Sequence, residues 1–268
     1  MEKVIGFIGL GEMGLPMAKN LIKAGYGLNI FDTNKRPLME LEKLGAHVLN
    51  SSREVARSSK IVMVMVRTPD EVREVIAGKE GLLTEAAPSS IILIMSTIDA
   101  GTAQEMSRLA GEKEVIVLDC PVSGGSPGAE AATLTIIAGG PEEVLESCKP
   151  ILEVMGKNIF YLGEIGMGES AKLINNLLLG IYMSAAYEAV ALAKKAGVKM
   201  DVLFDLLKVS TGNSWIIQHW DMVNSWKEHY VEGGSLDLLY KDIRLALAMG
   251  ESLKVPLHIS ALCNQLRF

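Results

Sequence analysis

The sequence predicts an α/β fold with two domains: a doubly wound parallel sheet first, and an all-α domain after it. Short apolar runs rich in Val and Ile alternate with helical patterns over the first 160 residues. Such alternation is typical of a mostly parallel sheet with helices on both faces. After about residue 162 the strand-like runs stop and only helical patterns follow. We therefore expect one domain at 1–162 and a second at 163–268.

Six apolar runs are expected to form the buried strands of the first domain. Each is four to six residues long and contains no charged residue, as expected for strands buried on both faces. The runs are Val4–Ile8, Leu28–Phe31, Ile61–Val66, Ile91–Met95, Val115–Leu118 and Leu134–Ala138.

The segments between these runs carry signals for the start and the end of helices. Gly25 follows apolar residues at helical spacing and is expected to act as a C-cap. Ser51 and Glu54 have the spacing of a capping box before a short helix. Pro69 is suited to the first position of another helix, because its missing N–H has no partner there in any case.

The second domain is expected to begin with one long helix. From Met167 to Ala196 there is no proline, and Ala, Leu, Lys and Glu dominate. These 30 residues would span about 45 Å as a helix, so we expect the helix to link two parts of the molecule. Further helical patterns follow at Asp201–Val209, Ser214–Met222, Leu236–Leu253 and from His258 to the end.

Composition and charge exclude several classes of function. The net charge is −6 and there is no basic run, so we expect no nucleic-acid partner. The three cysteines stand at unrelated spacings, which is typical of free thiols in a reducing compartment. No apolar run reaches the roughly 18 residues of a membrane span, and the first run lacks a signal-peptide cleavage site. We expect a cytoplasmic protein with no membrane partner and, from its scattered histidines, no metal site.

A glycine-rich turn follows the first predicted strand and opens the first predicted helix. Gly9, Gly11 and Gly14 fit the pattern G-x-G-x-x-G. The first glycine allows a tight turn, the second lets the backbone approach a pyrophosphate, and the third lets helix and strand pack closely. We interpret the turn, including Leu10 and Met13, as the dinucleotide site of a Rossmann domain. The alternative is a glycine turn in an unrelated strand–helix unit.

Asp32 stands at the end of the second predicted strand, 18 residues after Gly14. This is near the distance expected for an acidic residue that accepts from a ribose hydroxyl. A carboxylate repels the 2′-phosphate of NADP, so we expect NAD as the cofactor. Lys35 or Arg36 could instead bind that phosphate, which keeps NADP possible, although we prefer to interpret both as the solvated start of a helix.

Residues 5–25 resemble the opening of the β-hydroxyacid dehydrogenase family, which includes 3-hydroxyisobutyrate dehydrogenase and the tartronate, glyoxylate and succinate semialdehyde reductases. Residues 119–125 resemble its substrate segment, residues 163–176 its catalytic segment, and Lys241-Asp242 its late Lys-Asp pair. The resemblance covers essentially the whole chain. It implies oxidation of a short β-hydroxy acid with NAD(P), or reduction of the matching semialdehyde, by a homodimer or homotetramer.

The chemistry of the catalytic segment also follows from its residues. Lys172 and Asn176 are four apart on the long predicted helix and share a face, with Asn175 beside them. When a hydride leaves or reaches carbon, a proton must leave or reach oxygen. A lysine can carry that proton if burial lowers its pKa, and an amide beside it can orient the substrate oxygen. The alternative for Lys172 is an ordinary solvated lysine.

Other segments are expected to complete the site. The turn Ser123-Gly124-Gly125 offers backbone N–H groups and a hydroxyl to a substrate carboxylate, unless it is simply a tight turn. The resemblance implies that Ser96, Thr97 and Lys241 lie near the cofactor. The same role is expected for Thr68 and Pro69, which follow a strand.

Three rival functions stay open at this point. A glyoxylate or succinate semialdehyde reductase using NADPH would have the same segments. An imine reductase shares the fold but tends to lack the lysine, and so does a cofactor-binding sensor without turnover. The segment Gly233-Gly234-Ser235 stands where the family usually has an aromatic residue, and this departure leaves the substrate unidentified.

Overall fold

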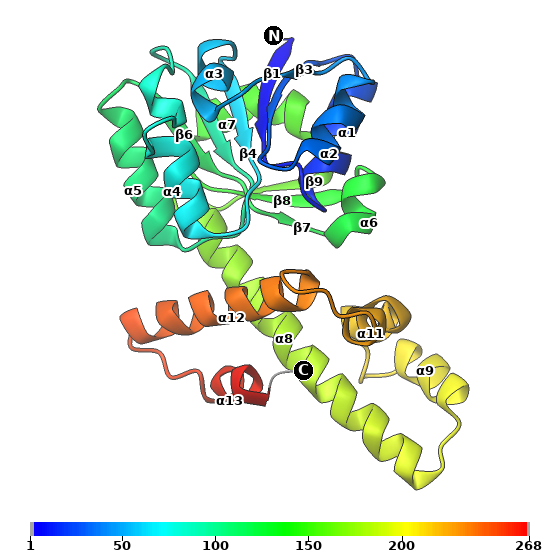
Figure 1. Ribbon diagram of the computed structural model, residues 1–268. Helices are drawn as coiled ribbons and strands as arrows, with labels where there is room; N and C mark the ends of the chain where they lie inside the picture. The colour runs from blue at the N-terminus through cyan, green and yellow to red at the C-terminus, as the bar shows by residue number, and fades with distance from the viewer. Residues whose placement is uncertain (1–2, 267–268) are drawn as a thin grey trace. The chain divides into compact units, whose positions relative to one another are not determined.

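The computed structural model describes residues 3–266 and divides into two compact units, Met1–Lys172 and Leu173–Phe268. Unit 1 contains all the strands and unit 2 is helical within the described residues (Figure 1). The predicted fold class, a parallel Rossmann sheet followed by a mainly helical domain, is confirmed.

The main sheet of unit 1 has six parallel strands in the order β3-β2-β1-β4-β5-β6. Its strands are β1 (Val4–Ile8), β2 (Gly27–Phe31), β3 (His47–Val48), β4 (Ile61–Val64), β5 (Ile91–Ile94) and β6 (Ile116–Asp119). Because all six are parallel, their carboxyl ends lie along one edge of the sheet. Ligands of such sheets bind at this edge.

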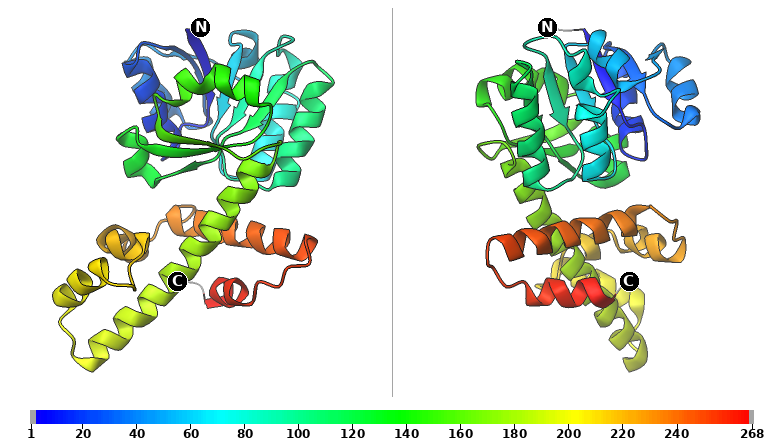
Figure 2. Two further views of the ribbon diagram at one scale, coloured as in Figure 1. Left: turned by 180° about the vertical axis from the view of Figure 1, so that it is seen from behind. Right: turned by 60° about the vertical axis from the view of Figure 1, so that its left-hand side comes forward.

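Helices cover both faces of the main sheet (Figure 2). They are α1 (Gly14–Lys23), α2 (Lys35–Glu42), α3 (Ser52–Arg57), α4 (Pro69–Ala77), α5 (Ala100–Gly111), α7 (Glu142–Leu152) and a 3₁₀ turn, η1 (Leu82–Thr84). In the five longer strands, side chains alternate between the two faces: in β4, Ile61 and Met63 belong to one core, and Val62 and Val64 to the other. These five strands are largely apolar runs in the sequence because both of their faces are buried, whereas both residues of β3 are exposed.

The last predicted strand of unit 1 does not join the main sheet. It forms β8 (Leu134–Ala138), antiparallel to β7 (Val122–Ser123) and parallel to β9 (Gly156–Tyr161), in a sheet of three strands. The chain leaves β6 through Cys120 and Pro121 and enters β7 directly, and the short helix α6 (Gly125–Glu130) then connects β7 to β8. The two sheets are joined by backbone hydrogen bonds between Asp119 and Gly139.

The predicted helix signals of unit 1 are present. Gly25 ends α1 with φ +89°, and the Ser51 hydroxyl accepts from Glu54 N at the start of α3. In a full capping box the Glu54 carboxylate would accept from Ser51 N. Here it accepts from Asn50 N instead. Pro69 is the first residue of α4, and the Thr68 hydroxyl caps that helix by accepting from Glu71 N at 3.1 Å.

The long helix α8 (Met167–Ala196) has the predicted bounds; it begins in unit 1 and continues into unit 2. In the described chain, α8 is long and apolar enough to cross a membrane by length and composition only, a test that core helices of soluble proteins also pass. The other helices of unit 2 are α9 (Met200–Val209), α10 (Trp215–Gln218), α11 (Trp220–Glu228), α12 (Ser235–Ser252) and α13 (His258–Leu266). The predicted helix Ser214–Met222 is wrong as one helix, because His219 leaves helical geometry with φ −120° and ψ 31°. Ser214 caps the shorter helix that results.

Candidate active site

The glycine turn lies between β1 and α1, at the carboxyl edge of the main sheet. A Cβ at Gly9 would lie 2.2 Å from Met65 O, and a Cβ at Gly14 would lie 2.0 Å from Gly9 O. These two glycines are therefore required by the packing of the turn itself. A Cβ at Gly11 would meet nothing within 4 Å. The turn is open at Gly11, the position at which a dinucleotide approaches the backbone, so its shape fits a bound pyrophosphate.

Asp32 follows β2 and holds the glycine turn. Its Oδ2 accepts from Leu10 N at 2.5 Å, and its Oδ1 accepts from Asn34 N at 2.6 Å. The carboxylate thus fixes the loop after β1 and the start of α2, a role that the sequence did not indicate. Each oxygen has a second lone pair, so the predicted bond from a ribose hydroxyl stays possible beside these two.

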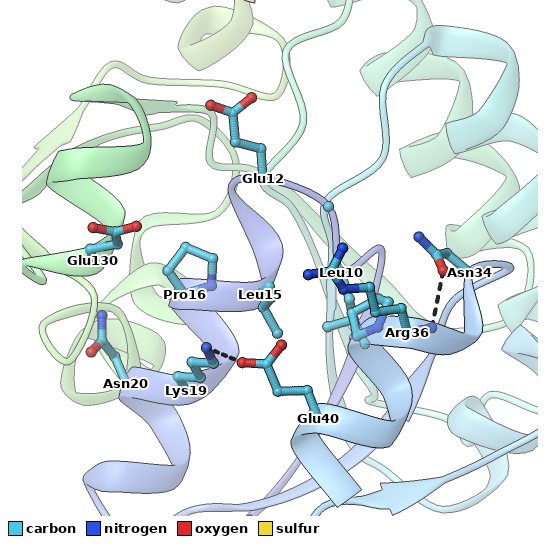
Figure 3. Close-up of a pocket in the computed structure, with 12 residues that line it drawn as sticks. Leu10, Glu12, Leu15, Pro16, Lys19, Asn20, Asn34, Arg36, Glu40 and Glu130 are labelled. Carbon is cyan, nitrogen blue, oxygen red and sulfur yellow. Dashed lines mark hydrogen bonds and ion pairs between the residues drawn. The ribbon is translucent and has the colours of Figure 1, made fainter. Parts of the chain in front are cut away.

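A groove of about 530 Å³ runs from the glycine turn between α1 and α2 (Figure 3). Leu10 and Gly11 are among its lining residues, and Lys19 and Glu40, which also line it, form an ion pair with 2.5 Å between Nζ and Oε1. Arg36 lines the groove and Lys35 does not. Of the two cations that could meet a cofactor phosphate, Arg36 is therefore the one beside the turn.

Two neighbouring loops at the same edge of the sheet contain the other predicted cofactor residues of unit 1. Ser96 is buried after β5, and its hydroxyl accepts from Val66 N, after β4, at 2.8 Å. This bond ties the two loops together. Thr97 is half-buried beside it. Thr68 and Pro69 follow β4 and form the start of α4, so both have a structural role in the helix besides the predicted one.

The predicted substrate turn lies at the end of β7. Gly124 and Gly125 have φ values of +132° and +63°, which favour glycine, and both are exposed, while Ser123 is half-buried. The next residue, Ser126, donates from its hydroxyl to Glu12 Oε1 at 2.5 Å. Because Glu12 belongs to the glycine turn, the structure brings the predicted substrate turn and cofactor turn together within unit 1.

The start of α8 is anchored by a buried carboxylate. Asp119, at the end of β6, accepts from Gly166 N and from Glu169 N, each at 2.8 Å. Burial raises the pKa of Asp119, and the N–H donors oppose that rise. Glu169 is also fully buried, and its Oε2 accepts from Ile98 N at 3.0 Å. The sequence signalled Asp119 only as part of a motif and gave no functional signal for Glu169.

The predicted catalytic pair lies on one face of α8. Lys172 and Asn176 are each 7% exposed, so Lys172 is not an ordinary solvated lysine. Asn175 is exposed, and its Nδ2 donates to Asn176 Oδ1 at 3.0 Å. The sequence placed Asn175 beside the pair, and the structure gives it a contact with the Asn176 amide.

A second buried carboxylate, Asp242 of α12, holds Asn176 within unit 2. Asp242 Oδ2 accepts from Asn176 Nδ2 at 2.7 Å, and Oδ1 lies 2.7 Å from Lys241 Nζ. Lys241, predicted to contact the cofactor, therefore has Asp242 as an ion-pair partner. The Asn176 amide is engaged at both its oxygen and its nitrogen, so its orientation is defined.

In the part of the chain that the structure describes, no three His, Cys, Asp or Glu residues group as a metal site.

Two family models together match nearly the whole chain. One describes the NAD binding domain of 6-phosphogluconate dehydrogenase and matches residues 4–163. The other describes the NAD-binding region of NADP-dependent 3-hydroxyisobutyrate dehydrogenase and matches residues 166–267. The boundary between the two models falls at the start of α8.

Relatives of known function cover most of the chain. A 3-hydroxyisobutyrate dehydrogenase of Pseudomonas aeruginosa is 37% identical over 271 residues, which cover 98% of this chain and 90% of the relative. An NAD-dependent L-serine dehydrogenase of the same organism is 38% identical, covering 91% of this chain and 84% of the relative. The structure of Mycobacterium tuberculosis 3-hydroxyisobutyrate dehydrogenase with L-serine has a TM-score of 0.87 at 32% identity, covering 100% of this chain and 93% of that one.

These matches agree with the geometry of the glycine turn and confirm the resemblance seen in the sequence, including the NAD(P) cofactor. The chain belongs to the β-hydroxyacid dehydrogenase family and is an NAD(P)-dependent hydroxy acid dehydrogenase of the 3-hydroxyisobutyrate dehydrogenase type.

Proposed function

We propose that Lys172 carries the proton while a hydride moves between NAD and a short β-hydroxy acid. The observation that carries this proposal is the burial of Lys172 on the face of α8 that also holds Asn176, one turn later. A lysine is rarely buried unless it is paired or functional. Burial also favours the neutral amine, which a general base requires.

The cofactor, when bound, supplies the hydride acceptor for oxidation and the hydride donor for reduction. During oxidation, Lys172 Nζ accepts the proton of the substrate hydroxyl; during reduction, the ammonium returns it to the carbonyl oxygen. Asn176 orients that oxygen through an amide that Asp242 and Asn175 hold in place. Because this amide is neutral, it adds no charge that competes with the proton transfer.

The proposed substrates have a primary hydroxyl β to a carboxylate. Relatives are named for 3-hydroxyisobutyrate and for L-serine, and both molecules have this arrangement. The Ser123–Gly125 turn supports the proposal, because its glycines leave backbone uncovered beside a hydroxyl and it lies next to the cofactor turn. A β-hydroxy acid without its carboxylate, the matching primary alcohol, is expected to be a poor substrate.

NAD is the proposed preferred cofactor because Asp32 places a negative charge at the end of β2. Arg36 in the adjoining groove supports some use of NADP. We also propose a homodimer formed through unit 2. Its exposed apolar side chains include Leu192 and Val209, 72% and 85% exposed, and similar residues on α9 and α13. A homotetramer is the alternative.

Turnover of a panel of β-hydroxy acids and semialdehydes, compared with wild type and Lys172→Ala, tests this function. We expect kcat of the variant to fall by roughly 10²–10⁴, the usual value of a positioned acid–base group. Cofactor affinity, followed by fluorescence, should stay within a few-fold because the glycine turn is untouched. Lys172→Arg should not restore turnover, since a guanidinium does not release its proton near neutrality.

The outcomes separate the rival functions. Near-normal kcat in Lys172→Ala would mean that another group carries the proton. Reduction of cyclic imines without turnover of hydroxy acids would identify an imine reductase. Cofactor binding with no turnover of any compound in the panel would favour a sensor. Reduction of glyoxylate or succinate semialdehyde with NADPH, in preference to the oxidation proposed here, would identify the semialdehyde reductase.

A further inference from the structure

Glu169 is a buried carboxylate at the active-site end of α8 that the proposed chemistry does not use. It lies in the first turn of the helix and is 0% exposed. Its Oε2 accepts from Ile98 N at 3.0 Å, and its own N–H donates to Asp119 Oδ2 at 2.8 Å. The loop after β5 and the end of β6 therefore fix the position of Glu169 from two sides.

Lys172 follows Glu169 by three residues, so both side chains lie on one face of α8. Long side chains on a helix lean toward its N-terminus, so the Lys172 side chain is expected to lean toward the turn that holds Glu169. Both side chains are almost fully buried. Water screens a pair of charges poorly there, so the carboxylate acts strongly on the state of the amine.

We propose that Glu169 is a positioning residue that keeps Lys172 protonated at higher pH and so sets the pH range of the reaction. The proposal rests on the proposed role of Lys172 as proton carrier. Burial of a lysine favours the neutral amine, and a neighbouring carboxylate favours the ammonium. The two effects oppose each other in Lys172, which leaves an amine that can both release and regain a proton. Without Glu169 the balance moves to the neutral form.

Three further ionisable groups belong to the segments that Glu169 contacts. Asp119 has both oxygens occupied by backbone N–H groups. Burial raises the pKa of the Cys120 thiol and keeps it neutral. Asp99, after Ile98, caps α5 and accepts from Thr102 N and Thr102 Oγ1. The hydrogen bonds of Asp119 and Asp99 do not use the Glu169 side chain, so the change of Glu169 to Gln is expected to leave them in place and to report the Glu169 charge.

The test is Glu169→Gln, which removes the charge and keeps a side-chain oxygen for Ile98 N. The matched control is Glu164→Gln, which makes the same change at an exposed carboxylate five residues earlier. Oxidation needs the neutral amine, so its rate rises with pH through the pKa of Lys172. In Glu169→Gln we expect that rise at a pH lower by about 1 unit or more, the usual effect of losing a nearby opposite charge. The control should keep the wild-type profile.

A second measurement follows Lys172 without turnover. The rate at which acetic anhydride modifies Lys172 in the cofactor-free protein, read by mass spectrometry at a series of pH values, reports the pKa of that amine. Glu169→Gln should shift this curve in the same direction as the rate profile. Glu169→Asp keeps the negative charge on a shorter side chain and should give a smaller shift. Unchanged curves in Glu169→Gln would overturn the proposal. Full activity in Lys172→Ala would instead contradict the proposed role of Lys172, a separable failure.

Discussion

Asp32 has one role that the structure shows and one that we propose, and substitutions can separate them. Its two oxygens accept from Leu10 N and Asn34 N, and its charge is proposed to oppose a 2′-phosphate. Asp32→Asn removes the charge and keeps one acceptor, whereas Asp32→Ala removes both acceptors. We expect both variants to narrow the preference for NAD over NADP by about tenfold, equivalent to roughly 1.4 kcal/mol of relieved repulsion. Only Asp32→Ala should also bind NAD clearly more weakly.

Steady-state kcat/KM with each cofactor measures the preference, and a fluorescence titration measures NAD affinity. A wild-type preference for NADP would show that Arg36, which lines the adjoining groove, outweighs Asp32. Equal NAD affinity in Asp32→Asn and Asp32→Ala would mean that the bond to Leu10 N does not hold the turn.

Asp242 is expected to affect turnover through Asn176. Its Oδ2 receives the Asn176 amide at 2.7 Å, and both residues are buried. Asp242→Leu removes that acceptor and frees the amide to rotate, so we expect kcat to fall by about 10–100-fold, the scale of a misplaced orienting group. Asp242→Asn can still present an oxygen to Asn176 Nδ2, and it should recover most of the loss.

Kinetics of both variants with the preferred hydroxy acid, beside their melting temperatures, test this prediction. If Asp242→Asn is as slow as Asp242→Leu while both fold, the ion pair with Lys241 is what matters. If neither variant changes kcat, the orientation of Asn176 does not limit the reaction.

At the scale of elements, the glycine turn shows which glycines serve the fold and which serve the ligand. A Cβ at Gly14 would lie 2.0 Å from a backbone oxygen, whereas a Cβ at Gly11 would meet nothing within 4 Å. Gly14→Ala should therefore destabilise the protein by about 1–3 kcal/mol, as overpacking does. Gly11→Ala should leave the free energy of unfolding within about 0.5 kcal/mol and weaken cofactor binding instead.

Urea unfolding and cofactor titration of the two variants measure these effects. Gly11→Ala is the control for the loss of stability in Gly14→Ala. Gly14→Ala is in turn the control for the loss of cofactor binding in Gly11→Ala. Normal NAD affinity in Gly11→Ala would mean that the cofactor does not approach the backbone at this position.

The strands with the strongest patterns could be predicted from the sequence, because burial on both faces leaves an unbroken apolar run. β3, β7 and β9 could not. The first two are only two residues long, and β9 mixes exposed and half-buried side chains along most of its length. The sheet that β8 joins depends on pairing with β7 and β9, which local pattern does not encode. The helix break at His219 likewise has no local signal, because no glycine or proline interrupts the helical pattern from Ser214 to Met222 and only the backbone of His219 leaves helical geometry.

The candidate site shows the same limit. The glycine turn, Lys172 and Asn176 are local patterns, and the sequence indicated them. The carboxylates that hold them act across the chain: Asp119 bonds to Glu169 over 50 residues, and Asp242 to Asn176 over 66. Such contacts are properties of the fold, and a single sequence gives no spacing from which to infer them.

At the scale of the whole molecule, the two units differ in how well they cover their own apolar side chains. Unit 1 has two large cores, one on each face of its sheet. Unit 2 has a small core around Met183 and Ile243. Many of its larger apolar residues stay exposed, including Leu192, Val202, Leu206, Val209, Ile259 and Leu262. Exposed apolar side chains in this number are typical of an interaction surface.

We expect that this surface of unit 2 holds two copies of the chain together. Leu192→Glu combined with Val209→Glu places two charges where an interface would be apolar, and burying an unpaired charge costs several kcal/mol. The double variant should therefore be a monomer at concentrations at which the wild type is a dimer. Light scattering after size-exclusion chromatography measures the mass of each. Met39→Glu, at a 55% exposed apolar residue of unit 1, is the matched control and should leave the mass unchanged. A monomeric wild type would contradict the prediction, and a wild-type mass near four chains would point to the homotetramer.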